Sequence, residues 1–150
     1  MVLNAFDGQF PPDGRWVSYG SPESGTFQVN VVPFDASTVL DTEPGAVTSL
    51  TRGQYRISAS VGVIARWRGD CKEIFYGWPG AGAMMAAEVD GKGNSFEAQK
   101  EQALFKLPEG FGLYDVHPNG KRFVTSRGVA NPNTPLTLVQ NWTALLANRQ

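Results

Sequence analysis

The sequence predicts an all-β fold built from three copies of a four-stranded antiparallel unit. A tight turn with one residue pattern occurs three times, and each copy is followed by a segment that alternates apolar and polar residues. The composition agrees, because 17 glycines and 10 prolines with only 18% charged residues favour short elements joined by turns over long amphipathic helices.

The repeated turn lies at Pro12 to Arg15, at Gly69 to Lys72 and at Pro118 to Lys121. Asp-Gly and Asn-Gly between two strand-like runs are strong hairpin signals, because these residues tolerate the positive φ of tight turns. The predicted structural turn residues are Asp13, Gly14, Asp70, Cys71, Asn119 and Gly120.

Strand-like runs surround each turn. Those before it are 5–10, 64–68 and 113–117, and those after it are 16–19, 73–76 and 122–125. Third strands are predicted at 27–32, 83–89 and 135–139, and fourth strands at 54–58 and 103–106. The repeating units therefore span approximately 5–60, 61–108 and 109–144.

The repeat is uneven in two places. Successive turns are 57 residues apart from Asp13 to Asp70 and 49 apart from Asp70 to Asn119, and we assign the excess to an extended loop over 35–53. The third unit has no evident fourth strand after Trp142, and the segment 1–4 is short for that role, so a second chain is one way to supply it.

Charge and residue counts exclude several classes of function. The net charge of -1 offers no basic field for a nucleic-acid backbone. One cysteine and one histidine allow neither an internal disulfide nor a Cys/His metal site of standard spacing. With no apolar run near 18 residues and no export signal at its start, the chain is expected to be soluble and not inserted in a membrane. Its compartment stays undetermined.

The combined pattern resembles a known repeat family. The matching segments are 10–25, 31–34, 66–76, 114–123 and 138–142. Together they are similar to the WD40-like β-propeller repeats related to TolB, of the PD40 type, in particular the C-terminal half of propeller domains fused to bacterial serine/threonine kinases or regulators. The resemblance implies that the three units are four-stranded blades of a β-propeller. The chain departs from the family at Cys71, which replaces a turn glycine, at His117, which replaces a serine, and in the long loop 35–53.

Propellers of this family have six to eight blades, so three blades form an open arc with exposed sheet faces and edges. Either further sequence supplies the other blades, or two chains associate into one six-bladed ring. We expect the second arrangement, a homodimer in which each chain is half of the ring.

No catalytic residue, metal or cofactor is predicted. Asp7 and Asp115 precede their turns on the innermost strands, so they are expected to face the channel, where they are candidate ligand contacts. Trp78, in a glycine-rich loop, is the first candidate for a contact residue, and His117 is a further one. For His117 a structural role beside the turn competes with general-base or metal chemistry. A calcium site is also considered for the carboxylates of Asp7, Asp13, Asp70, Glu73 and Asp115, and it competes with turn formation by Asp13 and Asp70.

Cys71 has two interpretations. It is a residue that has replaced the turn glycine, or it is a reactive thiol whose pKa Lys72 would lower.

Three functions remain open at this stage. The first is a non-enzymatic binding or scaffold module for a protein or small ligand. The second is an accessory propeller domain of a larger enzyme or sensor kinase, and the third is a metal-dependent hydrolase of the lactonase type.

Overall fold

The computed structural model describes residues 5–22, 24–35, 53–59 and 61–128, and within them the protein is all-β. Ten strands form three antiparallel sheets in this part of the chain. The first sheet contains β1 (Phe6–Gln9), β2 (Trp16–Ser21), β3 (Gln28–Pro33) and β4 (Tyr55–Arg56). The second contains β5 (Ile64–Trp67), β6 (Glu73–Gly77), β7 (Ala83–Lys92) and β8 (Ser95–Lys106). The third contains β9 (Phe111–Val116) and β10 (Phe123–Arg127).

Each sheet is a meander whose strands pair in sequence order. The expected strand at 135–139, Trp142, the segment 1–4 and most of the loop 35–53 lie outside the described residues. Among the residues that are described, no helix is long and apolar enough to cross a bilayer.

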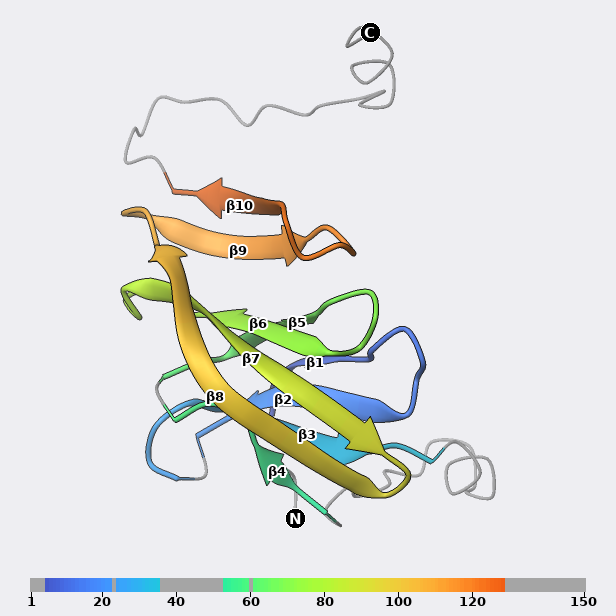
Figure 1. Ribbon diagram of the computed structural model, residues 1–150. Helices are drawn as coiled ribbons and strands as arrows, with labels where there is room; N and C mark the ends of the chain where they lie inside the picture. Colours follow the sequence, from blue (N-terminus) through green and yellow to red (C-terminus); the bar gives the residue numbers. More distant parts are fainter. Residues whose placement is uncertain (1–4, 23, 36–52, 60, 129–150) are drawn as a thin grey trace, which may run out of the picture.

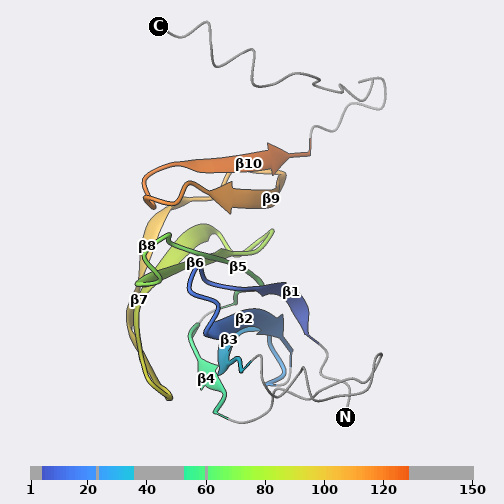
Figure 2. The ribbon, with the colours of Figure 1, turned by 90° about the vertical axis from the view of Figure 1, so that its right-hand side faces the viewer.

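The three sheets stack face to face in chain order, with the third sheet uppermost in Figure 1. The turns β1–β2, β5–β6 and β9–β10 all lie on one side of this stack, and the turns β2–β3 and β6–β7 lie on the other. The first strands of successive sheets contact each other, β1 with β5 and β5 with β9. Figure 2 shows β1 on one flank of the stack and the long strands β7 and β8 on the opposite flank.

The three first turns share one set of hydrogen bonds. The carboxylate or amide oxygen of Asp13, Asp70 or Asn119 accepts the backbone N–H two residues later, at 3.1, 3.1 and 3.0 Å. The next residue adopts a left-handed conformation in every case, with φ of 66° at Gly14, 61° at Cys71 and 71° at Gly120. These side chains close the turns locally, which is why Asp and Asn recur there.

The hairpins built on these turns also share one register. Gln9 pairs with Ser18, Arg66 with Phe75, and Asp115 with Val124, so the partner follows by nine positions each time. The repeat read from the sequence therefore corresponds to a repeated three-dimensional hairpin.

Two apolar clusters lie between the sheets. The cluster between the first and second sheets is centred on aromatic residues, with the Phe96 ring edge-on to Trp16 and Trp67 at centroid distances of 4.9 and 6.1 Å. The buried Trp67 indole N–H donates to the Ser18 hydroxyl at 2.9 Å, which joins the two sheets by a polar contact inside an apolar layer.

The second cluster joins the second and third sheets and contains Ile64, Phe75, Met84, Ala86, Leu107, Phe111 and Tyr114. The Tyr114 hydroxyl donates to the carbonyl oxygens of Ile64 and Phe75, at 2.9 and 3.0 Å. The turns meet as well, since the Gly69 N–H donates to the Pro118 carbonyl at 2.8 Å. A methyl group at Gly69 would lie only 2.9 Å from Pro118, so a side chain there would push the turns apart.

The second sheet differs from its prediction. Its fourth strand, expected only at 103–106, runs over 12 residues as β8, and β7 extends to Lys92 to pair with it. The first half of β8 is polar and exposed on most positions, so it carries no alternation of apolar and polar residues. A charged outer edge strand of this kind protects the sheet edge but hides the strand from pattern-based prediction.

Candidate functional site

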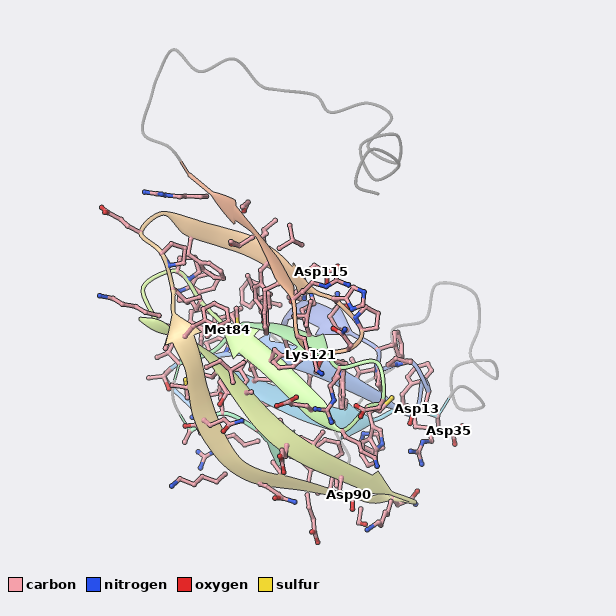
Figure 3. All side chains as sticks on the ribbon, turned by 45° about the horizontal axis from the view of Figure 1, so that its top comes forward. Asp13, Asp35, Met84, Asp90, Asp115 and Lys121 are labelled. Atoms are coloured by element: carbon pink, nitrogen blue, oxygen red, sulfur yellow. The ribbon has the colours of Figure 1, made fainter. Side chains whose placement is uncertain are left out.

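A row of polar side chains crosses the first strands of the three sheets. Gln9, Arg66 and Asp115 stand at the same distance before their turns and have equivalent pairing partners, so the stacking of the sheets brings them into one line. They share an open depression of about 610 Å³ with Tyr114 and the outer face of the third sheet. Figure 3 shows Asp115 at the third sheet, well away from Asp90 on the β7–β8 hairpin.

Arg66 holds the row together. Its guanidinium forms an ion pair with Asp7 of β1 at 2.6 Å and a longer one with Asp115 of β9 at 3.7 Å. The same guanidinium lies 5.7 Å from the centroid of the Tyr114 ring, a cation–π distance. One arginine from the middle sheet therefore bridges all three sheets.

Asp7 reaches this position through an irregular backbone. Its φ is 53°, and the pairing of β1 with β2 shifts register between Phe6 and Gln9. A bulge of this type re-aims a side chain, and Asp is among the few residues that tolerate the left-handed region. The bulge turns the carboxylate toward Arg66.

The structure thus brings Asp7 and Asp115 to one place, as their positions before the turns indicate, but it links them through Arg66. Arg66 was missed as a site residue. The signal for it was present, because Arg66 occupies the repeat position that Gln9 and Asp115 occupy in the other units.

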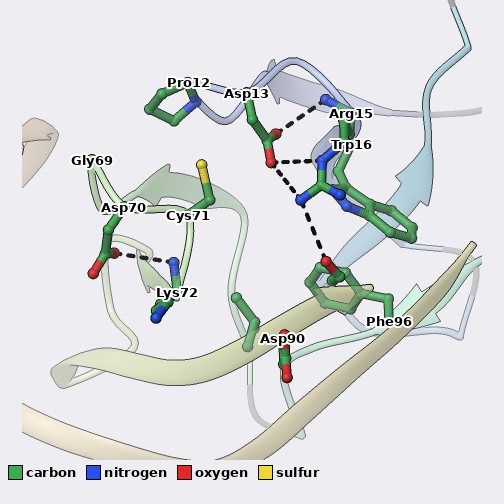
Figure 4. Close-up of a pocket in the computed structure, with 12 residues that line it drawn as sticks. Pro12, Asp13, Arg15, Trp16, Gly69, Asp70, Cys71, Lys72, Asp90 and Phe96 are labelled. Carbon is green, nitrogen blue, oxygen red and sulfur yellow. Dashed lines mark hydrogen bonds and ion pairs between the residues drawn. The ribbon is translucent and has the colours of Figure 1, made fainter. Parts of the chain in front are cut away.

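A second depression, of about 400 Å³, lies between the first turns of sheets one and two (Figure 4). Asp13 holds Arg15 by an ion pair at 2.8 Å, and Arg15 extends to the Gly91 carbonyl at 3.4 Å. The Cys71 sulfur points from the opposite turn toward Pro12 and Asp13.

The environment of Cys71 contradicts the interpretation that Lys72 lowers its pKa. Partial burial, with the nearby carboxylates of Asp13 and Asp70 as weaker contributors, raises the pKa of the Cys71 thiol. The Arg68 guanidinium, 2.7 Å from the Asp70 carboxylate, lowers the pKa of that carboxyl. The Asp70 side chain near the thiol therefore stays negatively charged. The thiol is therefore poorly suited to nucleophilic chemistry at neutral pH.

His117 belongs to the third turn. Its Nδ1 accepts the Asn119 N–H at 3.3 Å, its Nε2 lies 3.1 Å from the Arg122 guanidinium, and its backbone N–H donates to the Arg122 carbonyl. Both ring nitrogens therefore face donor groups of the turn, and a neutral imidazole accepts a hydrogen bond from one of them. The structure does not bring His117 into the network around Arg66.

Trp78 lies in the turn between β6 and β7, on the other side of the stack from the first turns. It is 37% exposed and borders a depression of about 500 Å³. The four candidate contact residues therefore fall into three places: Asp7 and Asp115 together, His117 in its turn, and Trp78 apart.

Within the described residues, no three side chains of His, Cys, Asp or Glu converge in a way that would hold a metal ion. The row of Gln9, Arg66 and Asp115, together with Asp7, instead offers one guanidinium and two carboxylates, which are charged, and one neutral amide that can form hydrogen bonds.

Comparison with known proteins finds a distant likeness among solved structures. No family model matches the chain, and no curated protein matches it. Among solved structures, the chain is similar to hydrazine synthase of Kuenenia stuttgartiensis, with a TM-score of 0.47 and 12% sequence identity. The likeness covers 85% of this chain and 46% of the other, so this chain spans less than half of that protein's length.

Proposed function

We propose that this chain is a β-propeller segment that serves as a non-enzymatic binding or scaffold module. The three sheets would be successive blades, and the row Gln9, Arg66 and Asp115 would line the central channel. Two chains would close a six-bladed ring, which presents the channel mouth and the loops to a protein or small ligand.

The repeated hairpin supports the propeller architecture. Three hairpins with the same turn chemistry and the same nine-residue register stack face to face, and their first strands lie side by side. In a propeller, the first strand of each blade borders the axis and successive blades pack by their faces. The polar, ion-paired row on these strands is the kind of surface that lines a solvated channel.

One observation carries the proposal that the third sheet packs against a further sheet. By the shared register, Leu113 and Val124 occupy the positions of Ile64 and Phe75 in the second sheet. Ile64 and Phe75 are 5% and 2% exposed because the third sheet covers them, whereas Leu113 and Val124 are each 68% exposed. Apolar residues at an inter-sheet position call for a fourth sheet, and a second copy of the chain would supply one.

Light scattering tests the ring closure. A chain that closes a ring by pairing has twice its own mass at micromolar concentration, and a monomeric mass under those conditions would refute the homodimer. Metal analysis of the same sample tests the competing hydrolase function, which requires stoichiometric calcium in the purified protein.

A further inference from the structure

A row of aromatic rings lies across the side of the stack that carries the β2–β3 and β6–β7 turns. The Trp78 indole stacks on Phe27 with a centroid distance of 6.0 Å and an interplanar angle of 21°. Phe27 in turn meets Phe6 edge-on at 5.6 Å. These contacts fix the orientation of Trp78 while 37% of its surface stays exposed.

The exposed part of Trp78 borders a depression of about 500 Å³ that is lined by the β6–β7 turn, β7, β8 and the segment before β5, all in or beside the second sheet. Val61, which precedes β5, and Met85 of β7 give the depression apolar walls. Glu101 of β8 gives it a carboxylate. The depression thus combines an aromatic ring, an apolar lining and one acidic group.

Glu101 is held in place by neutral donors. Its Oε2 accepts the hydroxyl proton of the buried Tyr76 and, at 3.3 Å, the backbone N–H of Ala59. No salt bridge to Glu101 occurs among the described residues. Neutral donors orient a carboxylate without cancelling its charge, so this part of the surface carries a positioned negative charge beside an aromatic ring.

We propose that the depression binds an organic ammonium group, with the charge held between the Glu101 carboxylate and the Trp78 indole and the alkyl groups against Val61 and Met85. Tryptophan is the best aromatic partner for a cation, and the attraction strengthens where water is partly excluded. The Glu101 carboxylate would repel an anionic ligand, and a neutral apolar ligand would gain no electrostatic attraction from it. This inference rests on the proposed role as a binding module and names a ligand class for it.

An NMR titration of the full chain tests the proposal. Choline and N-acetyllysine methylamide are the two cationic probes, one a free small cation and one a lysine side chain, and 3,3-dimethylbutan-1-ol is the neutral isostere of choline. The Trp78→Leu variant assigns the Trp78 indole N–H resonance, because that resonance is absent from its spectrum. We expect at least one of the two cations to shift this resonance in the wild type. The neutral isostere should bind roughly tenfold more weakly.

Charge variants identify the anionic partner. Glu101→Gln keeps an acceptor for Tyr76 but removes the charge, and it should weaken cation binding roughly tenfold. Glu97→Gln, on the same strand and exposed, is the matched control and should bind like the wild type. In the wild type, added salt should weaken cation binding but leave binding of the isostere unchanged.

Equal binding of choline and its isostere, salt-independent binding, or binding by neither cation would overturn the proposal. The wild-type measurements stand even if a variant does not fold. Light scattering of the same samples reports ring closure separately, so loss of this site and failure of the propeller proposal are distinguishable.

Discussion

At Cys71 a non-glycine residue holds a left-handed backbone, with φ of 61°, in a turn whose two counterparts use glycine. Left-handed backbone costs an L-residue about 1 kcal/mol, which glycine avoids. The same turn chemistry therefore operates at the second turn with an added strain. Asp7, with φ of 53°, accepts a similar strain, but there the carboxylate gains an ion pair with Arg66.

The first prediction concerns this strain. Cys71→Gly should raise the free energy of unfolding by about 0.5 to 1 kcal/mol, because glycine adopts the left-handed conformation without strain. The greater conformational entropy of glycine in the unfolded chain offsets only part of this gain. The reverse change, Gly14→Ala, should lower it by about 1 kcal/mol, since nothing lies within 4 Å of the added methyl group and only the backbone is strained. Urea denaturation measures both, and destabilisation by Cys71→Gly would contradict the argument.

The second prediction concerns the Cys71 thiol. Because burial raises its pKa, less thiolate is present at neutral pH than in an ordinary cysteine. Its reaction with a disulfide reagent at pH 7.5 should be slower than that of glutathione, and it should accelerate as the pH rises beyond the ordinary thiol pKa of about 8.5. Since Cys71 is the only cysteine, the Cys71→Ser variant gives the background. A rate above that of glutathione would restore the reactive-thiol interpretation.

Sequence reasoning at this scale succeeded where one residue determines its own surroundings. The turn side chains accept hydrogen bonds from the backbone two residues away, so the local sequence is enough to predict their role. These residues are Asp13, Asp70 and Asn119. It failed where several sheets combine. The pKa of Cys71 is raised mainly by its burial between the turns of two sheets, and the link from Asp7 to Arg66 depends on a bulge that no motif indicates.

At the scale of elements, each inter-sheet layer contains one buried polar contact that sets how the sheets meet. The Trp67 indole donates to Ser18 between the first two sheets, and the Tyr114 hydroxyl donates to the carbonyls of Ile64 and Phe75 between the next two. Two sheets held only by apolar contacts can slide over one another, whereas a buried hydrogen-bond donor is satisfied only where its acceptor lies within reach. These contacts therefore help to fix the stacking that forms the row around Arg66.

Tyr114→Phe is the third prediction. At pH 8 the variant should lose about 1 to 2 kcal/mol of unfolding free energy, because the carbonyls lose a buried donor. Burial raises the pKa of Tyr114, so the folded chain keeps its proton while the unfolded chain ionises near pH 10. Wild-type stability from this group is complete below about pH 10 and falls as the pH rises above it. The difference between wild type and variant should thus shrink from about pH 10 to about pH 11 in denaturation series, and a constant difference would show that folding does not raise the pKa of Tyr114.

Strand prediction at this scale depended on which side of a strand is covered. The strands beside the turns were located within a few residues, since the turn residues mark their ends and apolar or aromatic residues recur in β2 and β6, which are buried on almost every position. Most of β8 was missed because its first half, apart from the buried Phe96, is exposed and mostly polar.

At the scale of the whole molecule, the apolar face of the second sheet is covered by the next sheet in the stack, whereas the equivalent face of the third sheet is exposed. Ile64 and Phe75 are buried by the sheet above them, and Leu113 and Val124 occupy the same register positions with that cover lacking among the described residues. The number of units was readable from the turns. Closure into a six-bladed ring was expected from that number and stays a proposal, because it depends on what covers the outer surface of the third sheet.

The fourth prediction follows from this surface. If a second copy covers the third sheet, the double variant Leu113→Lys, Val124→Lys should convert a dimer to a monomer in light scattering, because two charges would be buried in the interface without partners. Leu104→Lys is the matched control: Leu104 is 38% exposed on the outer strand β8, and its substitution should leave the mass unchanged. Circular dichroism should show the same β-sheet content in all three proteins. Should the double variant keep the dimeric mass, the two chains associate through another face, and the six-bladed ring built on the third sheet is wrong.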